Sequence, residues 1–182
     1  VCGCKTTVIP DSVTRIAYYA FYGCTSLENI TIPESVTAID KGAFGGCTSL
    51  VGISIPKNVR RISGFDGCTS LESITIPDSV TELGLAAFSD CTSLKSIAIP
   101  ESVTEIVDNV FRDCASLESI VVADDNPVYD SREGCNAIIE TTTNTLIQGC
   151  KTTVIPESIT AIRDKAFSGC TSLKSITIPD SV

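Results

Sequence analysis

The sequence contains no histidine, methionine or tryptophan, and aromatic residues make up only 5% of its 182 residues. Without histidine, no imidazole is present to activate a serine or cysteine nucleophile. Neither a glycine-rich phosphate loop nor a nucleophile elbow occurs. We therefore expect no catalytic residue, no metal site and no cofactor. Carboxylates are plentiful, which leaves a two-carboxylate hydrolase as a remote alternative.

Positive charge and long apolar runs are also scarce. Lys and Arg number 13 against 22 Asp and Glu, which gives a net charge of −9. Such a chain repels phosphate backbones, so nucleic acid is not an expected partner. No run of eighteen apolar residues occurs, so we expect no direct membrane insertion. The 43% apolar content is sufficient for the core of one domain.

An internal repeat dominates the sequence. The repeating unit reads I-P-[DE]-S-V-T-x-I-x-x-x-A-F-x-G-C-T-S-L-x-S-I-T, and its Ile-Pro pairs begin at Ile9, Ile32, Ile55, Ile76, Ile99, Ile155 and Ile178. A unit this short cannot bury its own apolar face, so neighbouring units must stack into a solenoid. We assign repeats to about 9–121 and 155–182. We expect residues 1–182 to form a single domain, an excerpt of a longer array.

Each unit contains two extended segments and one turn. The pattern L-x-x-I-x-I, as in Leu71 to Ile76, alternates with period two and predicts a short strand, which Pro77 ends. A second extended piece, such as Val80 to Leu83, follows. A single helical turn is expected before each cysteine, as at 164–168. It ends at residues that tolerate a left-handed backbone, namely Gly23, Gly46, Gly67, Asp90, Asp113 and Gly169.

The columns L-x-x-I-x-I-P, V-x-x-I, A-F-x-G-C and T-S-L resemble the BspA-like, or Treponema-type, class of leucine-rich repeats. This resemblance implies a β-rich α/β solenoid, coiled right-handedly. A parallel sheet would lie on its concave side, and short strands or helical turns on its convex side. It also implies a bacterial cell-surface or secreted protein, or a protist counterpart, that attaches to other proteins.

Residues 122–154 depart from the repeat. Here "CNAIIE" and "TLIQGC" flank "TTTN", which predicts a hairpin cassette inserted between coils. The start of the chain, "CGCKTTVIPDS", matches "QGCKTTVIPES" in the cassette, so Cys4 is the counterpart of Cys150. Counted back from the next Ile-Pro pair, Cys150 occupies the place of Leu173. We expect it to be a small apolar substitute for that leucine.

Six of the ten cysteines occupy one column of the repeat: Cys24, Cys47, Cys68, Cys91, Cys114 and Cys170. Their spacing of 21 or 23 residues does not fit the closely paired ligands of a zinc site. Stacked coils place such side chains parallel at roughly 4.8 Å, too far apart for the usual Cβ separation of a disulfide. We predict a reduced, buried thiol ladder.

Two cysteines outside the column are less defined. Cys2, in Cys2-Gly3-Cys4, is a weak candidate for a soft-metal or oxidation site. Cys135 lies next to a turn, a position that allows exposure.

The outward side chains of the L-x-x-I-x-I strands define the candidate concave binding face. They are small and mostly polar: Asn29, Thr31, Gly52, Ser54, Ser73, Thr75, Ser96, Ala98, Ser119, Val121, Ser175 and Thr177. Such a face suits broad contact with a protein or glycan ligand, although it lacks a hot-spot aromatic or arginine. A structural spacer that projects other domains is the main alternative. An ice-binding surface is a remote one, and curvature argues against it.

A candidate aromatic patch is formed by Tyr18, Tyr19 and Tyr22, where other units carry small or charged residues. Exposed tyrosines are common binding anchors, and packing against a preceding cassette explains them equally well. A column of carboxylates follows each Ile-Pro pair except the one at Pro56, where Lys57 stands: Asp11, Glu34, Asp78, Glu101, Glu157 and Asp180. One carboxylate per coil supplies too few ligands for calcium, so we interpret this column as a solvated turn edge.

These patterns together predict a non-catalytic interaction or adhesion module of an extracellular or cell-surface protein.

Overall fold

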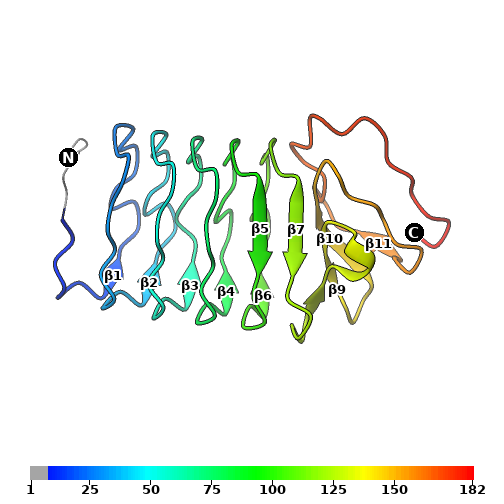
Figure 1. The fold of residues 1–182 in the computed structure, drawn as a ribbon, viewed down its shortest axis with the longest axis horizontal. Helices are drawn as coiled ribbons and strands as arrows, with labels where there is room; N and C mark the ends of the chain where they lie inside the picture. Colours follow the sequence, from blue (N-terminus) through cyan, green and yellow to red (C-terminus); the bar gives the residue numbers. More distant parts are fainter. Residues whose placement is uncertain (1–7) are drawn as a thin grey trace.

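The computed structural model describes residues 8–182 and shows a β-solenoid whose coils lie side by side in a row (Figure 1). Cys2 and Cys4, and the predictions made for them, lie outside the described residues. The strands are β1 (Arg15–Ile16), β2 (Ala38–Ile39), β3 (Arg61–Ile62), β4 (Glu82–Leu83), β5 (Ser96–Ile99), β6 (Glu105–Ile106), β7 (Ser119–Val122), β8 (Tyr129–Asp130), β9 (Ala137–Glu140), β10 (Thr145–Gly149) and β11 (Ala161–Ile162). Within residues 8–182 the one helical segment is the short 3₁₀ turn η1 (Arg132–Gly134).

The V-T-x-I segments build the longest sheet of the molecule. β1, β2, β3, β4 and β6 pair in parallel in that order, with Ile16 opposite Ile39 and Ile39 opposite Ile62. The second residue of each strand is buried, whereas the first is exposed or half-buried. The predicted second extended piece is therefore present, and it forms the continuous ladder.

The L-x-x-I-x-I segments form less regular sheet than the sequence predicted. Of these segments within residues 8–182, only β5 and β7 pair as strands, in parallel, with Ser96 opposite Ser119. The other regular coils keep a similar alternation of exposed and buried residues in this segment without ladder pairing, whereas in the final coil Leu173 and Ile176 are half-buried and Ile178 is exposed. Period-two alternation specifies which side chains enter the core, but it does not specify the register between coils that a ladder requires.

The turn before each cysteine is not helical, which corrects the expected single helical turn. Successive amides alternate between two kinds of partner. The amide of Phe21 donates to the carbonyl of Ala43 in the next coil at 2.7 Å, whereas the amide of Tyr22 donates within the turn to the carbonyl of Tyr19 at 3.2 Å. Coil-to-coil bonds thus replace the helical pattern. The predicted left-handed positions are confirmed, with φ between 61° and 79° at Gly23, Gly46, Gly67, Asp90, Asp113 and Gly169.

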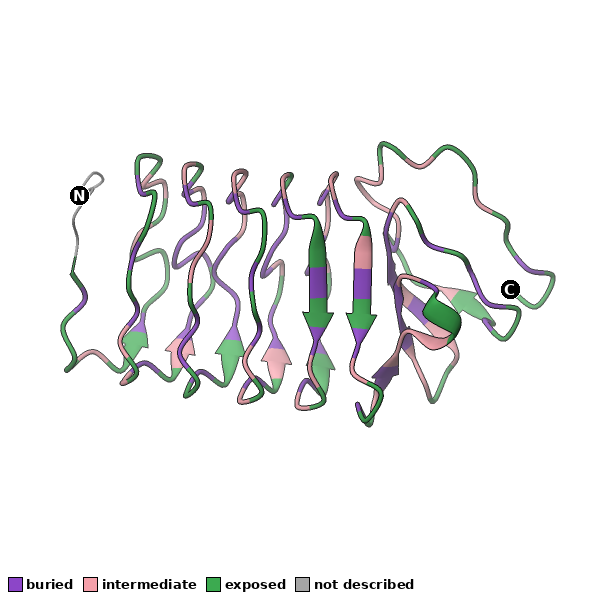
Figure 2. Ribbon diagram, in the orientation of Figure 1, coloured by how far each residue is buried: buried purple, intermediate pink, exposed green. Residues whose placement is uncertain are grey.

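A column of phenylalanines runs through the core. The rings of Phe21, Phe44, Phe65, Phe88 and Phe111 stack with centroids 5.1 to 5.8 Å apart and planes within 7° of parallel. Buried residues recur along every regular coil, whereas almost all of residues 170–182 are exposed or half-buried (Figure 2). Phe167 does not join the stack; it packs, partly buried, against a second core cluster built around the hairpin.

Residues 122–154 separate the last regular coil from the final one. β9 and β10 pair antiparallel, joined by residues 141–144, and β8 adds to β9. On its other side β10 pairs in parallel with β11 of the final coil. The regular sheet ends at β6, and a four-stranded sheet in the order β11-β10-β9-β8 follows it.

Side chains at the start of this interval cap the last regular coil. The Asn126 amide group donates to the carbonyls of Pro100 and Val103 at 2.8 and 2.9 Å, and its oxygen accepts from the amides of Val128 and Tyr129. The Ser131 hydroxyl accepts from the amide of Val122 at 3.0 Å. These bonds satisfy backbone groups that a following coil would otherwise satisfy.

Candidate interaction surfaces

The candidate binding face lies along the β5 and β7 side of the solenoid, which we call the β5–β7 face. All its predicted outward residues are exposed except Gly52 and Ser119, which are half-buried. Two shallow hollows lie on this side. One of about 600 Å³ includes Asn29, Thr31 and Ser54, and one of about 470 Å³ includes Thr75 and Ser96. The polar groups of Asn29, Thr31 and Ser54 thus border one hollow, and those of Thr75 and Ser96 border the other.

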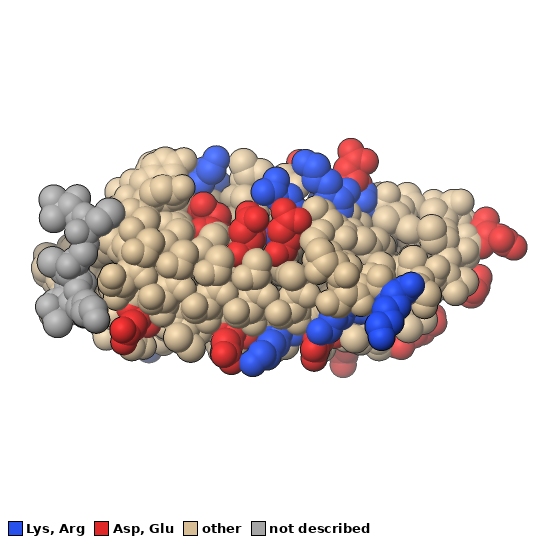
Figure 3. Space-filling model, turned by 90° about the horizontal axis from the view of Figure 1, so that it is seen from above, with Lys and Arg blue, Asp and Glu red and all other residues tan. Residues whose placement is uncertain are grey.

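A row of paired charges borders this face, and the sequence analysis did not single it out. Lys95 Nζ lies 2.8 Å from Glu72 Oε2, and Lys151 Nζ lies 2.5 Å from Glu118 Oε1. The hydrogen bond from Lys95 lowers the pKa of Glu72, and the hydrogen bond to Glu72 raises the pKa of Lys95. Opposite charges also lie beside one another within largely uncharged surface when the molecule is viewed from above (Figure 3). Glu72, Lys95 and Glu118 share one repeat column, so the signal was present in the sequence.

The tyrosine patch is well defined. Tyr18, Tyr19 and Tyr22 are 60%, 53% and 53% exposed, and the Tyr19 and Tyr22 rings meet edge to face at 5.4 Å. Arg15 lies over the Tyr18 ring, 6.0 Å from its centroid, and its guanidinium also pairs with the buried Asp40 carboxylate at 2.6 Å. Arg15 therefore links the Tyr18 ring to an ion pair between the first two coils.

Two glycines of the second coil seat these rings. A methyl group on Gly42 would overlap the Tyr19 ring, and one on Gly45 would lie 2.8 Å from the Tyr22 ring. No bulkier residue fits under the tyrosines without moving them. The sequence pointed to the tyrosines, but the role of Gly42 and Gly45 in leaving space for the rings was missed. These glycines occupy the same repeat columns as Tyr19 and Tyr22, one unit later, and could have indicated the contact.

The column cysteines line the core beside the phenylalanines. Cys47, Cys68, Cys91 and Cys114 are buried, while Cys24 and Cys170 are half-buried. Each buried thiol donates to the carbonyl of the phenylalanine in the preceding coil, at 3.1 to 3.3 Å. Burial raises the pKa of the Cys114 thiol to about 12 and also raises the pKa values of Cys68 and Cys91 well above the ordinary value.

Two further cysteines belong to the hairpin interval. Cys135 is buried, with only 1% of its surface exposed, so the suggestion that its position beside a turn allows exposure was wrong. Cys135 belongs to the second core cluster together with Ala137 and Leu146. Cys150 is also buried, as expected for a substitute for a core leucine.

The carboxylate column after the prolines is exposed in every coil. No group of three or more potential metal-ligating side chains occurs in the part of the chain that the structure describes. Across residues 8–182 no helix has the length and apolar character needed to span a bilayer.

These features define a leucine-rich-repeat β-solenoid with extended polar surfaces. The chain belongs to the BspA type leucine rich repeat family, whose model matches residues 1–118, 63–148 and 138–182 in six copies. The resemblance seen in the sequence is thereby confirmed. No curated protein matches the sequence.

Several solved structures share the fold. A leucine-rich repeat protein from Bacteroides ovatus is 30% identical with a TM-score of 0.65, over 93% of this chain and 42% of its own. A leucine rich cell surface protein from Faecalibacterium prausnitzii is 27% identical with a TM-score of 0.70, over 98% of this chain and 61% of its own. The Leucine Rich Repeat protein of T. pallidum is 31% identical with a TM-score of 0.67, over 91% of this chain and 76% of its own. This chain thus spans about half the length of the first two.

Proposed function

We propose that this chain is a non-catalytic, extracellular interaction module that binds a protein or glycan through its solvent-exposed side chains. The observation that carries the proposal is the seated tyrosine pair. Tyr19 and Tyr22 are more than half exposed, yet their positions are defined by contact with each other and with Gly42 and Gly45. Preorganised aromatic side chains lose little entropy on binding, which suits them as anchors.

The β5–β7 face supplies the second part of the proposed contact surface. Its small hydroxyl side chains accept and donate hydrogen bonds without steric bulk, which favours broad contact over a single deep pocket. The hollow beside Thr75 and Ser96 is where a partner would approach most closely. A surface location is supported by the Faecalibacterium relative, which is described as a cell surface protein.

The test is quantitative binding of the purified chain to immobilised cell-surface protein extracts and to a glycan array. Saturable binding that weakens at least tenfold in Tyr19→Ser/Tyr22→Ser, or in Thr75→Glu/Ser96→Glu, is the expected result. Thr104→Glu is the matched control, because Thr104 is exposed and precedes β6 of the five-stranded sheet, outside the β5–β7 face.

The alternative function is that of a spacer which projects other domains. The row of stacked coils, with its uncharged and nearly aromatic-free β5–β7 face, favours it. Absence of saturable binding to any source, or binding that all these variants leave unchanged, supports the spacer and contradicts the proposed module. Turnover of a substrate that a single point mutation abolishes would contradict both.

A further inference from the structure

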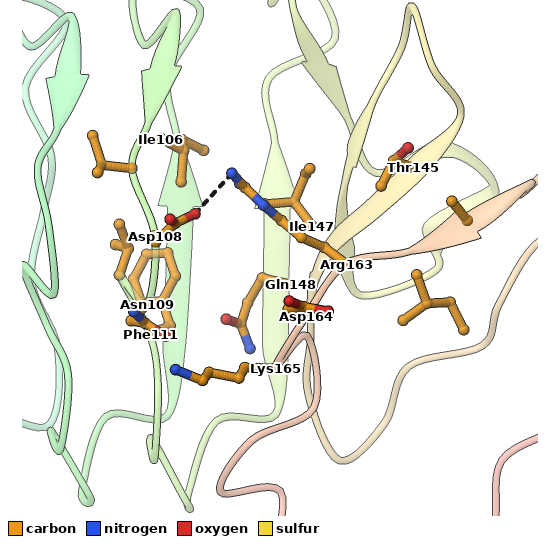
Figure 4. Close-up of a pocket in the computed structure, with 14 residues that line it drawn as sticks. Ile106, Asp108, Asn109, Phe111, Thr145, Ile147, Gln148, Arg163, Asp164 and Lys165 are labelled. Atoms are coloured by element: carbon orange, nitrogen blue, oxygen red, sulfur yellow. Dashed lines mark ion pairs between the residues drawn. The ribbon is translucent and has the colours of Figure 1, made fainter.

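A cleft of about 500 Å³ lies between the last regular coil and the β10–β11 strands (Figure 4). Residues 106–111 form one wall. β10, β11 and residues 163–165 form the other. The cleft borders the sheet that ends at β6 and shares no lining residue with the β5–β7 face or the tyrosine patch. It is therefore a separate surface, and the inference below does not rest on the proposed function.

Elsewhere in the array, backbone hydrogen bonds between coils close this position. The amides of Ala86 and Phe88 donate to the carbonyls of Asp108 and Val110 at 3.1 and 2.9 Å. The first coil has the same pair of bonds, from Tyr19 and Phe21, at 3.3 and 2.7 Å. In these two coils, two amides that are two residues apart donate to alternate carbonyls of the next coil. In the second coil the amides of Gly42 and Phe44 donate instead to the adjacent carbonyls of Ser63 and Gly64, because the next unit is two residues shorter.

In the last regular coil these amides belong to Asn109 and Phe111, and neither donates to any group among residues 8–182. For Phe111 the cause is that the expected acceptor binds other donors. The carbonyl of Ala166, the counterpart of the usual acceptor, is bound instead by the Gly149 amide at 2.8 Å and by Gln148 Nε2 at 2.9 Å. The next amide, that of Asp113, still reaches the final coil at the carbonyl of Ser168, 3.2 Å away. β10 thus takes the place of the last regular coil as the neighbour of the final coil at this stretch.

The cleft also has an available positive charge. The Lys165 side chain points across it toward the wall of Asn109 and Phe111 (Figure 4) and forms no ion pair with any described residue. Arg163, by contrast, is paired with Asp108 across 2.8 Å. Two unpaired amides and the Lys165 ammonium group therefore border the same space, and the Asp164 carboxylate also lines it.

We propose that this cleft binds an extended, carboxylate-bearing peptide segment of a partner protein. Alternate carbonyls along one edge of an extended chain match the spacing of the Asn109 and Phe111 amides, because the next coil presents carbonyls with this spacing to the equivalent amides elsewhere. A carboxylate of the peptide pairs with Lys165 in a charge-assisted hydrogen bond. The volume is in the range of sites that enclose small ligands.

The experiment titrates the ¹⁵N-labelled 182-residue chain with acetyl-Val-Glu-Val-Glu-Val-amide and with its Val-Gln-Val-Gln-Val counterpart. We expect the Asn109 and Phe111 amide resonances to shift and their hydrogen exchange to slow. We expect the glutamate peptide to bind about tenfold more tightly than the glutamine peptide, since one such ion pair at a partly enclosed site contributes about that ratio. Lys165→Gln should remove this difference, and Lys174→Gln, an exposed lysine outside the cleft, should preserve it.

Three results would overturn the proposal. The first is no binding up to millimolar peptide, which means that the amides are only hydrated. The second is that Lys165→Gln and wild type bind the glutamate peptide with equal affinity, or that the peptide shifts only amide resonances outside the cleft. The third is a stronger shift of the same amides by inorganic phosphate or an oligosaccharide, which assigns another ligand class. Spectra of the variants that are unchanged away from the cleft show that the fold is intact.

Discussion

The hydroxyl oxygen of Tyr129 accepts a hydrogen bond from the backbone amide of Ile106 over 3.1 Å. Ile106 lies on β6, the last strand of the regular sheet, so its amide faces the side where another coil would continue the ladder. The phenol takes the place of the absent carbonyl. Both residues are buried, so this single bond satisfies a donor that water does not reach freely.

Removal of this acceptor is expected to destabilise the last regular coil. Tyr129→Phe keeps the ring but leaves the Ile106 amide unpaired, at a cost of about 1 to 3 kcal/mol in the free energy of unfolding. Urea denaturation followed by circular dichroism measures the change. Tyr18→Phe, at an exposed ring, should change stability by less than about 0.5 kcal/mol. Equal effects of the two substitutions would contradict the capping role of Tyr129.

The phenylalanine stack predicts a graded response to truncation. Phe65→Ala removes a fully buried ring that contacts Phe44 on one side and Phe88 on the other, so a loss of about 3 to 5 kcal/mol is expected. Phe167→Ala removes a half-buried ring outside the stack and should cost markedly less. Denaturant midpoints of the two variants check this order, and the reverse order would show that the stack is not the main core element.

The thiol ladder predicts ordered reactivity toward alkylation. In the native protein at pH 8, iodoacetamide should modify the half-buried Cys24 and Cys170 before Cys47, Cys68, Cys91 and Cys114, which are shielded and held as thiols. Peptide mapping by mass spectrometry gives the order. All of them should react once the chain is unfolded in guanidinium. Rapid native modification of the buried four, or missing thiols after unfolding, would refute the reduced ladder.

The raised pKa values of these thiols predict loss of stability at alkaline pH. A raised pKa means that the folded state keeps the proton above pH 9, where the unfolded state releases it. The contribution of Cys114 is therefore complete below pH 9 and declines as the pH rises toward its folded pKa of about 12, by on the order of 4 kcal/mol. Chemical denaturation at several pH values between 8 and 11.5 should show a shallower decline for Cys114→Ala than for wild type. Parallel declines would contradict the assignment.

Much of the fold follows from repeat columns alone. The solenoid, the phenylalanine and cysteine columns, the left-handed residues such as Gly46 and Asp90, and the outward hydroxyl residues were all predictable. A position that recurs in every coil has the same neighbours above and below. Its packing is therefore determined by the residues at the same repeat position in the neighbouring coils.

The departures arise where one coil differs from the next. The sequence located the interval 122–154 but not the capping by Asn126 and Tyr129, because these side chains bond to backbone groups about 25 residues away that no local pattern identifies. The glycine seats under Tyr19 and Tyr22 likewise depend on contacts between coils.

The sequence by itself therefore determined the family, the stacked-coil architecture and the side chains that enter the core, since apolar periodicity and chain sterics act locally. Only the tertiary structure decided which extended segments pair as strands, how the last regular coil is capped and where the stack opens. Those outcomes depend on competition for backbone acceptors between distant segments. At the carbonyl of Ala166, Gly149 and Gln148 occupy the place that the repeat assigns to Phe111, and the cleft is the consequence.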